Sequence, residues 1–328
     1  MSNTSALSGI SAFFENPITN FGKLAKSLLV PLIGLAIFLV CWEIGAKSVK
    51  TSLGAFPGPV AVYEQSINLI NEHQAERDKE IAFIKRQEER NAKKLAKNPD
   101  AKVKIRPYTG NPTFFDQIGT SLITVLSGFI LASLIAIPGG IMIGLNNTLY
   151  SALNPLIQLF KPVSPLAWLP LVTMVVSAVY VSNDPMFAKS FITSLITVSL
   201  CSLWPTLLNT AVGVSTISKD LQNVSQVLRL NWFTHVIKIV LPSAIPMIFT
   251  GLRLSLGIAW MVLIAAEMLA QNPGLGKFVW DEFQNGSSSS LGRIMVAVLV
   301  IGLIGFMLDR IMLFLQRKVS WDKTAITR

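Results

Sequence analysis

Histidine, cysteine and charged residues are all scarce in this sequence of 328 residues. It contains two histidines and two cysteines, and charged residues make up only 14% of the chain. No G-x-x-x-x-G-K-[ST] phosphate-binding loop, H-E-x-x-H zinc motif or G-x-S-x-G nucleophile motif is present. The nearest match, Gly274-Leu275-Gly276-Lys277, lacks the first glycine and the hydroxyl residue of a phosphate-binding loop. We therefore expect that this chain does not hydrolyse ATP and is not an enzyme.

The few reactive side chains have no catalytic partners close in the sequence. His73 lies in a charged region and His235 in a polar loop, and neither is near a nucleophile or a second base. Cys41 and Cys201 fall in apolar segments, which gives neither a disulfide framework nor a metal-ligand spacing. The net charge of +10 comes without zinc-finger spacing or an aromatic-interleaved basic run. We expect no metal, no cofactor held by this chain and no nucleic-acid partner.

Long apolar segments dominate the chain instead. Apolar residues make up 51% of it and the mean hydropathy is +0.54, whereas an ordinary soluble domain has about a quarter of its residues charged. A helix needs about 20 mostly apolar residues to cross a bilayer. Six segments are candidates: Ser27–Ala46, Ile118–Gly144, Leu166–Val181, Lys189–Asn209, Ile248–Ala270 and Ile294–Leu315. The third is short and contains a helix-breaking proline, Pro170. The sequence predicts an all-α integral membrane protein with about six transmembrane helices.

Basic residues in the short loops indicate the orientation, because cytoplasmic loops carry an excess of lysine and arginine. With the N-terminus inside, most of these residues lie on the inner side, and the short outer loops hold only Lys277 and Arg293, with Lys189 at a boundary. Both termini are then cytoplasmic. The first apolar segment is too long for the core of a signal peptide, so we expect it to be retained as a membrane helix.

A charged insert runs against this orientation. Residues 47–117 hold 13 Lys or Arg against 9 Asp or Glu, and the topology puts them outside. Loops longer than about 60 residues cross the membrane largely regardless of charge, so the orientation stands. Within the insert, Asn68–Lys97 is predicted to form an exposed helix laced with ion pairs, which the prolines and glycine of residues 98–112 end.

The polar loop at residues 218–242 is the most informative segment. Ser218 can cap a helix whose first turn contains Asp220. Apolar residues then recur at helical spacing: Leu221, Val224, Val227 and Leu228. This pattern predicts a short amphipathic helix between two membrane segments. Such a helix can lie flat in the membrane interface or dock in the groove of a partner.

This loop resembles the coupling loop of permease subunits in bacterial ABC importers. The family pattern is Glu-Ala-Ala, three residues, Gly, nine residues, Ile, one residue and Leu-Pro. Here the same spacing reads Asn223-Val224-Ser225, Arg229, Ile239 and Leu241-Pro242. Asn, Val, Ser and Arg replace the family's Glu, Ala, Ala and Gly. Since arginine lacks the conformational freedom of glycine, we expect Arg229 not to make the sharp turn that glycine allows.

The resemblance covers about residues 27–320, except the insert. The runs Gly251-Leu252-Arg253, Ala265-Ala266-Glu267-Met268 and Gly274-Leu275-Gly276 look like the nitrate, sulfonate and taurine branch of these permeases. Residues 164–182, 202–214, 277–298 and 305–312 most resemble cyanobacterial nitrate permeases, with bicarbonate permeases as close relatives. The implied organisation is a cytoplasmic segment 1–26, a type I importer (MetI-like) transmembrane domain 27–320 with a periplasmic insert 68–112, and a tail 321–328.

The resemblance implies a mechanism and partners. The permease would pair with a second copy in the bacterial plasma (inner) membrane, and two ATPase subunits would bind ATP and Mg²⁺. In this branch the two ATPases typically differ, and one can carry a fused regulatory binding domain. A periplasmic or lipid-anchored nitrate-binding protein would deliver the substrate and could contact the insert, as could lipid headgroups. The predicted contacts with the ATPase are Leu221, Asn223, Val224, Ser225, Val227, Leu228, Arg229 and Trp232.

Polar residues inside the membrane segments are candidates for the substrate pathway, because charges there are costly and usually face a cavity or each other. Arg253 is a possible inner anion contact, and Glu267 is expected near the outer mouth. Hydroxyl and amide donors of the fourth segment form the remaining candidates: Ser194, Thr197 and Asn209. The structural alternative is snorkelling or pairing with a carbonyl for Arg253, pairing for Glu267 and helix packing for the other three, and residues of these types more often have such roles. Asp309 and Arg310 are expected to anchor the last helix at the interface.

Alternatives remain open on the sequence alone. Nitrate, with nitrite as a further substrate, is the first expectation, and bicarbonate is an alternative within the same branch. A secondary transporter driven by an ion gradient would show an internal repeat, and no second copy of the coupling pattern occurs. A membrane anchor that presents the insert to a soluble partner would keep its function without residues 218–232.

Overall fold

The computed structural model describes residues 17–51, 54–98, 103–181 and 186–319. The start of the predicted N-terminal segment, residues 1–16, and the predicted tail 321–328 lie outside the described residues. The elements are α2 (Pro17–Ser48), β1 (Lys50–Thr51), β2 (Gly54–Ala55), α3 (Pro59–Lys97), α4 (Phe114–Leu145), α5 (Asn147–Phe160), α6 (Pro165–Val179), α7 (Lys189–Ser215), α8 (Lys219–Val227), α9 (Trp232–His235), the π-helix η1 (Val236–Val240), α10 (Leu241–Ala270), α11 (Leu275–Asn285) and α12 (Ser290–Val319). Strands β1 and β2 form a small antiparallel pair.

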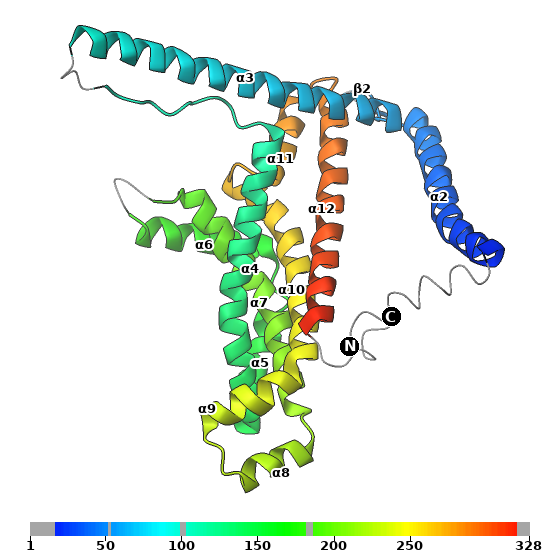
Figure 1. Cartoon of the computed structure of the whole chain (residues 1–328), viewed down its shortest axis with the longest axis vertical. Coiled ribbons are helices and arrows are strands. Elements are labelled where there is room, and N and C mark those ends of the chain that lie inside the picture. The colour runs from blue at the N-terminus through cyan, green and yellow to red at the C-terminus, as the bar shows by residue number, and fades with distance from the viewer. Residues whose placement is uncertain (1–16, 52–53, 99–102, 182–185, 320–328) are drawn as a thin grey trace.

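The centre of the molecule is a bundle of α4, α7, α10 and α12, with α7 packed against both α4 and α10 (Figure 1). Five stretches of the described chain are long and apolar enough to cross a membrane: Leu29–Ser48, Phe114–Leu145, Lys189–Ser215, Trp232–Ala270 and Ser290–Val319. A sixth crossing is reached if the bent pair α5 and α6 is counted as one span. The predicted all-α fold with about six spans is therefore confirmed.

The third predicted membrane segment, Leu166–Val181, is shorter in the structure than a full span and follows a sharp bend. Its helix, α6, has 15 residues, and α5 and α6 are bent by 99° relative to each other. The break falls where Ser164 caps α6 and Pro165 takes its first position, because a proline cannot continue the hydrogen bonds of a preceding helix. Hydropathy alone could not show this bend, since both sides of it are apolar.

Small residues let α4 and α7 approach closely. A Cβ atom added to Gly140 would lie 2.6 Å from Thr210 Cβ and 2.7 Å from the carbonyl oxygen of Leu207. A Cβ on Gly144 would similarly meet Ala211 and Val214 of α7. The Gly140-x-x-x-Gly144 spacing is typical of close contacts between membrane helices. In α12, Gly305 faces Trp260, whereas Gly302 has open space around it.

A serine of α10 is inserted into the backbone ladder of α7 next to Pro205. Ser255 Oγ donates to the carbonyl oxygen of Ser202 at 2.6 Å and accepts from the backbone N–H of Thr206 at 3.1 Å. These two backbone groups would bond each other in an undisturbed helix. Because no water is present in the bilayer core to satisfy them, a neighbouring hydroxyl takes that place. The contact joins α7 to α10.

Helix α3 starts earlier than the sequence predicted and ties the bundle together at one end. It begins at Pro59 rather than near Asn68 and has 39 residues, about 58 Å at 1.5 Å per residue. It runs across the ends of α12 and α4 on the side opposite α8 (Figure 1). Arg293 of α12 forms ion pairs with Glu72 and with Glu282 of α11, both at 2.6 Å.

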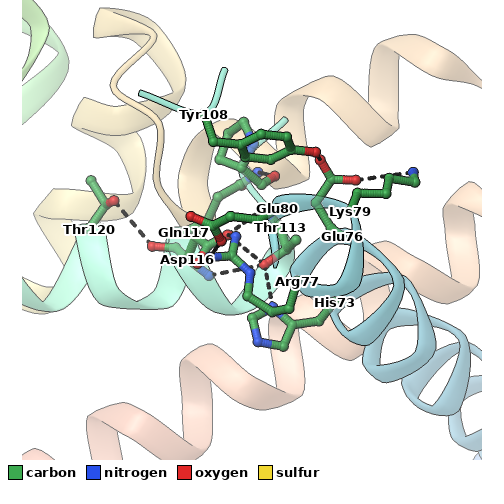
Figure 2. Close-up of polar contacts among 11 residues, drawn as sticks. His73, Glu76, Arg77, Lys79, Glu80, Tyr108, Thr113, Asp116, Gln117 and Thr120 are labelled. Atoms are coloured by element: carbon green, nitrogen blue, oxygen red, sulfur yellow. Dashed lines mark hydrogen bonds and ion pairs between the residues drawn. The ribbon is translucent and has the colours of Figure 1, made fainter. Parts of the chain in front are cut away.

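A polar cluster fixes the start of α4 beneath α3 (Figure 2). Thr113 and Asp116 form a capping box, in which each side chain accepts from the other's backbone N–H. Asp116 also pairs with Arg77 of α3 at 3.0 Å, and His73 Nδ1 lies 2.7 Å from Thr113 Oγ1. The cap therefore joins the local start of one helix to the side of another.

Helix α2 stands apart from the bundle (Figure 1). Only 6% of the most apolar 18 residues of this helix are buried. One hydrogen bond links it to the chain just before α3, where Trp42 Nε1 donates to the carbonyl oxygen of Pro57. Apolar side chains along its described part are about half exposed, for example Leu29 at 54% and Phe38 at 57%. The described part of the chain thus leaves most of α2 uncovered.

The glycine contacts of α4 give a first prediction. Gly140→Ala places a methyl group against the backbone of α7, whereas Gly139→Ala has only Leu207 Cδ1 nearby, at 3.5 Å. We expect Gly140→Ala to lower the free energy of unfolding by about 1–3 kcal/mol through overpacking. Gly139→Ala should leave it unchanged or slightly raised, because alanine favours helix. Thermal unfolding of the detergent-purified variants measures the difference, and equal melting temperatures would contradict the close packing.

Candidate functional site: the loop between α7 and α10

The loop between α7 and α10 forms two short helices at one end of the bundle, as Figure 1 shows. Ser218 caps α8, its Oγ accepting from the backbone N–H of Leu221 at 3.5 Å, and Asp220 lies in the first turn. The predicted amphipathic helix and its cap are thus present. The apolar side chains of α8 and of the turn after it are exposed: Leu221 at 40%, Val224 at 48%, Val227 at 81% and Leu228 at 63%. No described part of the chain covers this apolar face.

Arg229 makes the turn that ends α8, and the expectation that it could not do so was wrong. Its φ is 47°, in the left-handed region. Its N–H donates to the carbonyl oxygen of Gln226, and the N–H of Leu230 donates to that of Ser225. These two bonds form a Schellman motif, in which glycine usually occupies the left-handed position. The favourable bonds hold the arginine in a conformation that costs about 1–2 kcal/mol for an L-residue.

Ser225 points into the molecule rather than toward the exposed face. It is 7% exposed, and its Oγ lies 2.8 Å from His235 Nδ1 of α9. This contact joins α8 to α9 across the turn. Behind it lies a cavity of about 930 Å³ between the loop and the ends of α4 and α7, lined among others by Tyr150, Val214 and Gln222. His235 therefore braces the loop, a role that the sequence did not indicate.

The loop continues into the membrane without a break. Asn231 caps α9, and α9, η1 and α10 follow one another as a continuous stretch, Trp232–Ala270. The π-helical turn comes just before Pro242, which has no N–H to donate and so disturbs the helical ladder. Trp232 and Phe233 at its start are exposed and pack edge to face at 5.0 Å. A force on these residues acts directly on the end of α10.

Arg253 of α10 is paired with Asp309 of α12. Its Nε and Nη2 donate to the two carboxylate oxygens at 2.5 Å and 3.1 Å, a bidentate arrangement. The side chains are 40% and 34% exposed. Asp309 thus has a definite partner in α10, and its expected role as an interface anchor stays a prediction. The guanidinium of Arg310 lies over the ring of Phe306 at 4.8 Å.

Glu267 is completely buried at the opposite end of α10 from the loop. Its carboxylate accepts from Ser121 Oγ of α4 and from the backbone N–H of Gly276, each at 2.9 Å. Gly274 and Gly276 leave no room for a Cβ beside it. The carboxylate therefore caps the start of α11, where the helix dipole favours a negative charge. The runs Ala265-Ala266-Glu267 and Gly274-Leu275-Gly276 therefore pack together as one unit. Glu267 is buried within this unit and is not exposed at the mouth of a pathway in this chain.

The remaining polar candidates lie in the helix interfaces of α7. Thr197 Oγ1 donates to the carbonyl oxygen of Thr193 at 2.8 Å, and Asn209 Nδ2 donates to that of Pro205 at 2.8 Å. Ser194 is fully buried, and its Oγ makes no hydrogen bond with the part of the chain that the structure describes. Among the described residues, no hydrogen bond joins any of these three residues to Arg253, whose partner is Asp309.

The left-handed arginine gives a second prediction. Arg229→Gly should raise the free energy of unfolding by about 0.5–1 kcal/mol, because relief of the strain outweighs the entropy of the glycine in the unfolded chain. The control is Leu228→Gly at the preceding position, where φ is −78° and any residue is tolerated. This substitution should lower the free energy of unfolding, because glycine adds entropy to the unfolded chain without relieving strain. Melting temperatures of the two purified variants provide the comparison. A lower melting temperature for Arg229→Gly than for the unaltered protein would show that Arg229 makes stabilising contacts instead.

Comparison with known proteins places this loop and bundle in a family. Residues 128–321 match the family described as binding-protein-dependent transport system inner membrane component. The match includes the bundle helices α7, α10 and α12, most of α4, and the whole loop.

Individual relatives agree. The bicarbonate transport system permease protein CmpB of Synechococcus elongatus is 34% identical over 295 residues, which cover 88% of each chain. The nitrate import permease protein NrtB of Synechocystis is 31% identical over 299 residues, which cover 90% of each chain. Among solved structures, a chain of the inward-facing MetNI methionine ABC transporter matches with a TM-score of 0.49 and 16% identity, over 66% of this chain and 96% of that chain.

The family match covers more than half of the chain, and the two cyanobacterial relatives extend it to nearly the whole length. Relatives of both substrate names occur at similar identity, so the comparisons support the branch rather than one anion. The chain belongs to the family of binding-protein-dependent inner membrane transport components, and it is an integral membrane permease of the nitrate and bicarbonate branch of ABC importers.

Proposed function

We propose that this permease works as a homodimer with two ATPase subunits and imports nitrate, with nitrite as a further substrate, across the bacterial plasma membrane. The observation that carries the coupling part is the exposed apolar face of α8, formed by Leu221, Val224, Val227 and Leu228. A short helix of this kind fits a hydrophobic groove on a partner. Since the chain has no phosphate-binding loop, the ATP and Mg²⁺ belong to that partner.

The connection from the loop to the bundle supports a mechanical role. Trp232 stands at the start of the continuous stretch that becomes α10, and Ser225 with His235 holds α8 against this stretch. When the ATPases close, a displacement of α8 would pull on α10 relative to its neighbours. The cavity of about 930 Å³ behind the loop leaves space for such a displacement. The membrane helices would then rock between inward-open and outward-open states.

Exposed apolar surface supports pairing with a second copy. Helix α6 presents Leu171 at 57% and Met174 at 66% exposure, and α2 is almost entirely uncovered. Lipid can cover part of these surfaces. The substrate pathway of a homodimer would run between the two copies, so that residues from both would line it.

Nitrate is favoured by the long stretches that resemble nitrate permeases, with bicarbonate as the alternative. Of the predicted pathway residues, Arg253 best suits an anion. Its side chain pairs with Asp309 but is 40% exposed, so part of the positively charged guanidinium remains accessible. Ser194, with its unbonded hydroxyl, is a second candidate. A neutralised arginine attracts an anion only weakly, which suits a passage that must release its substrate. Selection would then fall mainly to the binding protein that delivers the anion.

A third prediction tests the docking of α8 with two substitutions that add the same charge. Val224→Glu puts a carboxylate in the centre of the exposed apolar face, and we expect the ATPase subunits no longer to copurify. Asn223→Glu adds the same charge one position earlier, about 100° around the helix from Val224, at the position where the family has Glu, and should keep the complex intact. Stoichiometry of the affinity-purified complex is the measurement. An intact complex with Val224→Glu would exclude docking through this face.

A fourth prediction concerns the substrate. The complex, purified with its co-encoded partners and reconstituted in vesicles, should hydrolyse ATP faster and take up label when the binding protein presents nitrate. Bicarbonate presented in the same way is the matched alternative. Stimulation by bicarbonate alone would replace nitrate as the substrate and leave the coupling role intact. Absence of a copurifying ATPase would reject the importer mechanism itself.

A further inference from the structure

The outer part of α3 projects beyond the bundle as an arm. We define the α3 arm as residues 78–98 of α3 together with the returning segment 103–112. The arm extends past Arg77, the last contact of α3 with α4 through Asp116, by about 30 Å at the helical rise per residue. Figure 1 shows the returning segment on the side of α3 that faces the membrane helices.

Specific contacts hold the returning segment on the helix. The side chain of Gln87 donates to the backbone carbonyl of Arg106 and accepts from its N–H, both at 2.8 Å. Tyr108 donates to Glu76 at 2.7 Å, and its ring packs on Phe83 with centroids 5.4 Å apart. The hydrogen bond from Tyr108 holds the pKa of Glu76 below its usual value, so this carboxylate stays charged at neutral pH. These contacts make the arm a built hairpin rather than a loose loop, and Figure 2 shows the one between Tyr108 and Glu76.

The tip of the arm is strongly basic. Eight cations lie on its described residues from 85 onward, against the two acids Glu88 and Glu89: Lys85, Arg86, Arg90, Lys93, Lys94, Lys97, Lys104 and Arg106. None of these eight forms an ion pair with a described residue. The acidic residues of α3 nearer the bundle, by contrast, form ion pairs with basic side chains: Glu72, Glu76 and Glu80. The positive charge at the tip is therefore available for an external anionic surface.

Apolar side chains accompany this charge on the arm. Ile105 of the returning segment is 85% exposed, and Ile81 and Ile84 of the helix are 63% and 44% exposed. Exposed isoleucines beside free lysines and arginines are typical of a helix that lies in a membrane interface. An acidic protein surface would pair with the cations but would not explain the three exposed isoleucines.

We propose that the α3 arm lies on the outer leaflet and binds the anionic headgroups of phospholipids, with Ile105 inserted at the headgroup boundary. The proposal rests on the proposed function for its orientation, because it places the α8 loop inside and α3 outside. Lipid bound at the tip would steady α3, which holds α12 through Arg293 and Glu72 and holds α4 through Arg77 and Asp116. The lipid surface thereby supports the ends of two bundle helices.

The test measures the depth of single labelled positions in the reconstituted complex. In a background with Cys41→Ser and Cys201→Ser, a fluorophore is attached to Ile105→Cys or to the control Glu89→Cys. Glu89 follows Gln87 by two residues and so points about 200° away from the returning segment. In vesicles that contain phosphatidylglycerol, lipid-borne nitroxide should quench the label at 105 about twofold or more above the label at 89, and aqueous iodide should do the reverse.

Charge removal separates anionic lipid from other partners. The triple substitution of Lys93, Lys94 and Lys97 by Gln should remove the difference in quenching, as should vesicles made only of phosphatidylcholine, since each cation near an anionic surface contributes about fivefold in binding. Equal quenching of both positions by iodide in phosphatidylglycerol vesicles would overturn the proposal. Protection of position 105 that occurs only after the binding protein is added would assign the arm to that protein instead. Lipid quenching is read without nucleotide, so a failure of ATPase coupling is scored separately.

Discussion

The close approach of α7 to both α4 and α10 is the interaction on which the other features depend. Lipid tails are as apolar as leucine, so helices in a bilayer associate through tight packing and hydrogen bonds rather than through burial from water. Glycines provide this packing on both sides of α7. Gly140 and Gly144 of α4 accept the side chains of Thr210 and Val214, and Gly251 of α10 lies against α7 at the turn of Thr206. Any larger residue would separate the helices.

This packing determines what the loop between α7 and α10 can do. The loop joins two helices that pack closely against each other, so a displacement of α8 would act on α7 or on the stretch that becomes α10. Ser225 and His235 keep α8 attached to the start of α9, while the apolar face of α8 stays exposed. The left-handed Arg229 closes the turn between them at the cost of backbone strain. A partner that bound the apolar face of α8 would therefore act on a short segment that its own contacts hold together.

Several polar groups of the bundle connect one helix to another. Glu267 is an acceptor for Ser121 and for the start of α11, which makes it part of the packing. Arg253 and Asp309 join α10 to α12 and remain half exposed. Helix α3 performs a similar joining role outside the bundle, because Glu72 pairs with Arg293 of α12 and Arg77 pairs with Asp116 of α4. The eight cations near the tip of the α3 arm, by contrast, form no ion pair with a described residue.

The sequence by itself determined the all-α membrane class, the existence and type of most spans, and the position and cap of α8. These features depend on hydropathy over about 20 residues or on neighbours three and four positions apart, which a single sequence displays directly. The family also followed from the spacing of residues 223–242. The turn at Arg229 was missed because local propensity disfavours it, and the Schellman bonds and the packing around them override that propensity.

Only the tertiary structure decided the partners of the buried polar groups and the shape of the insert. Ser121 and Glu267 are 146 positions apart, and Arg253 and Asp309 are 56 apart, so no local pattern connects them. The 99° bend between α5 and α6 and the course of α3 across α12 and α4 likewise arise from contacts with other helices. Periodicity identifies which face of a helix is apolar, but it does not identify the element that covers that face. The covering element is decided by packing and hydrogen bonding between segments that lie far apart in the sequence.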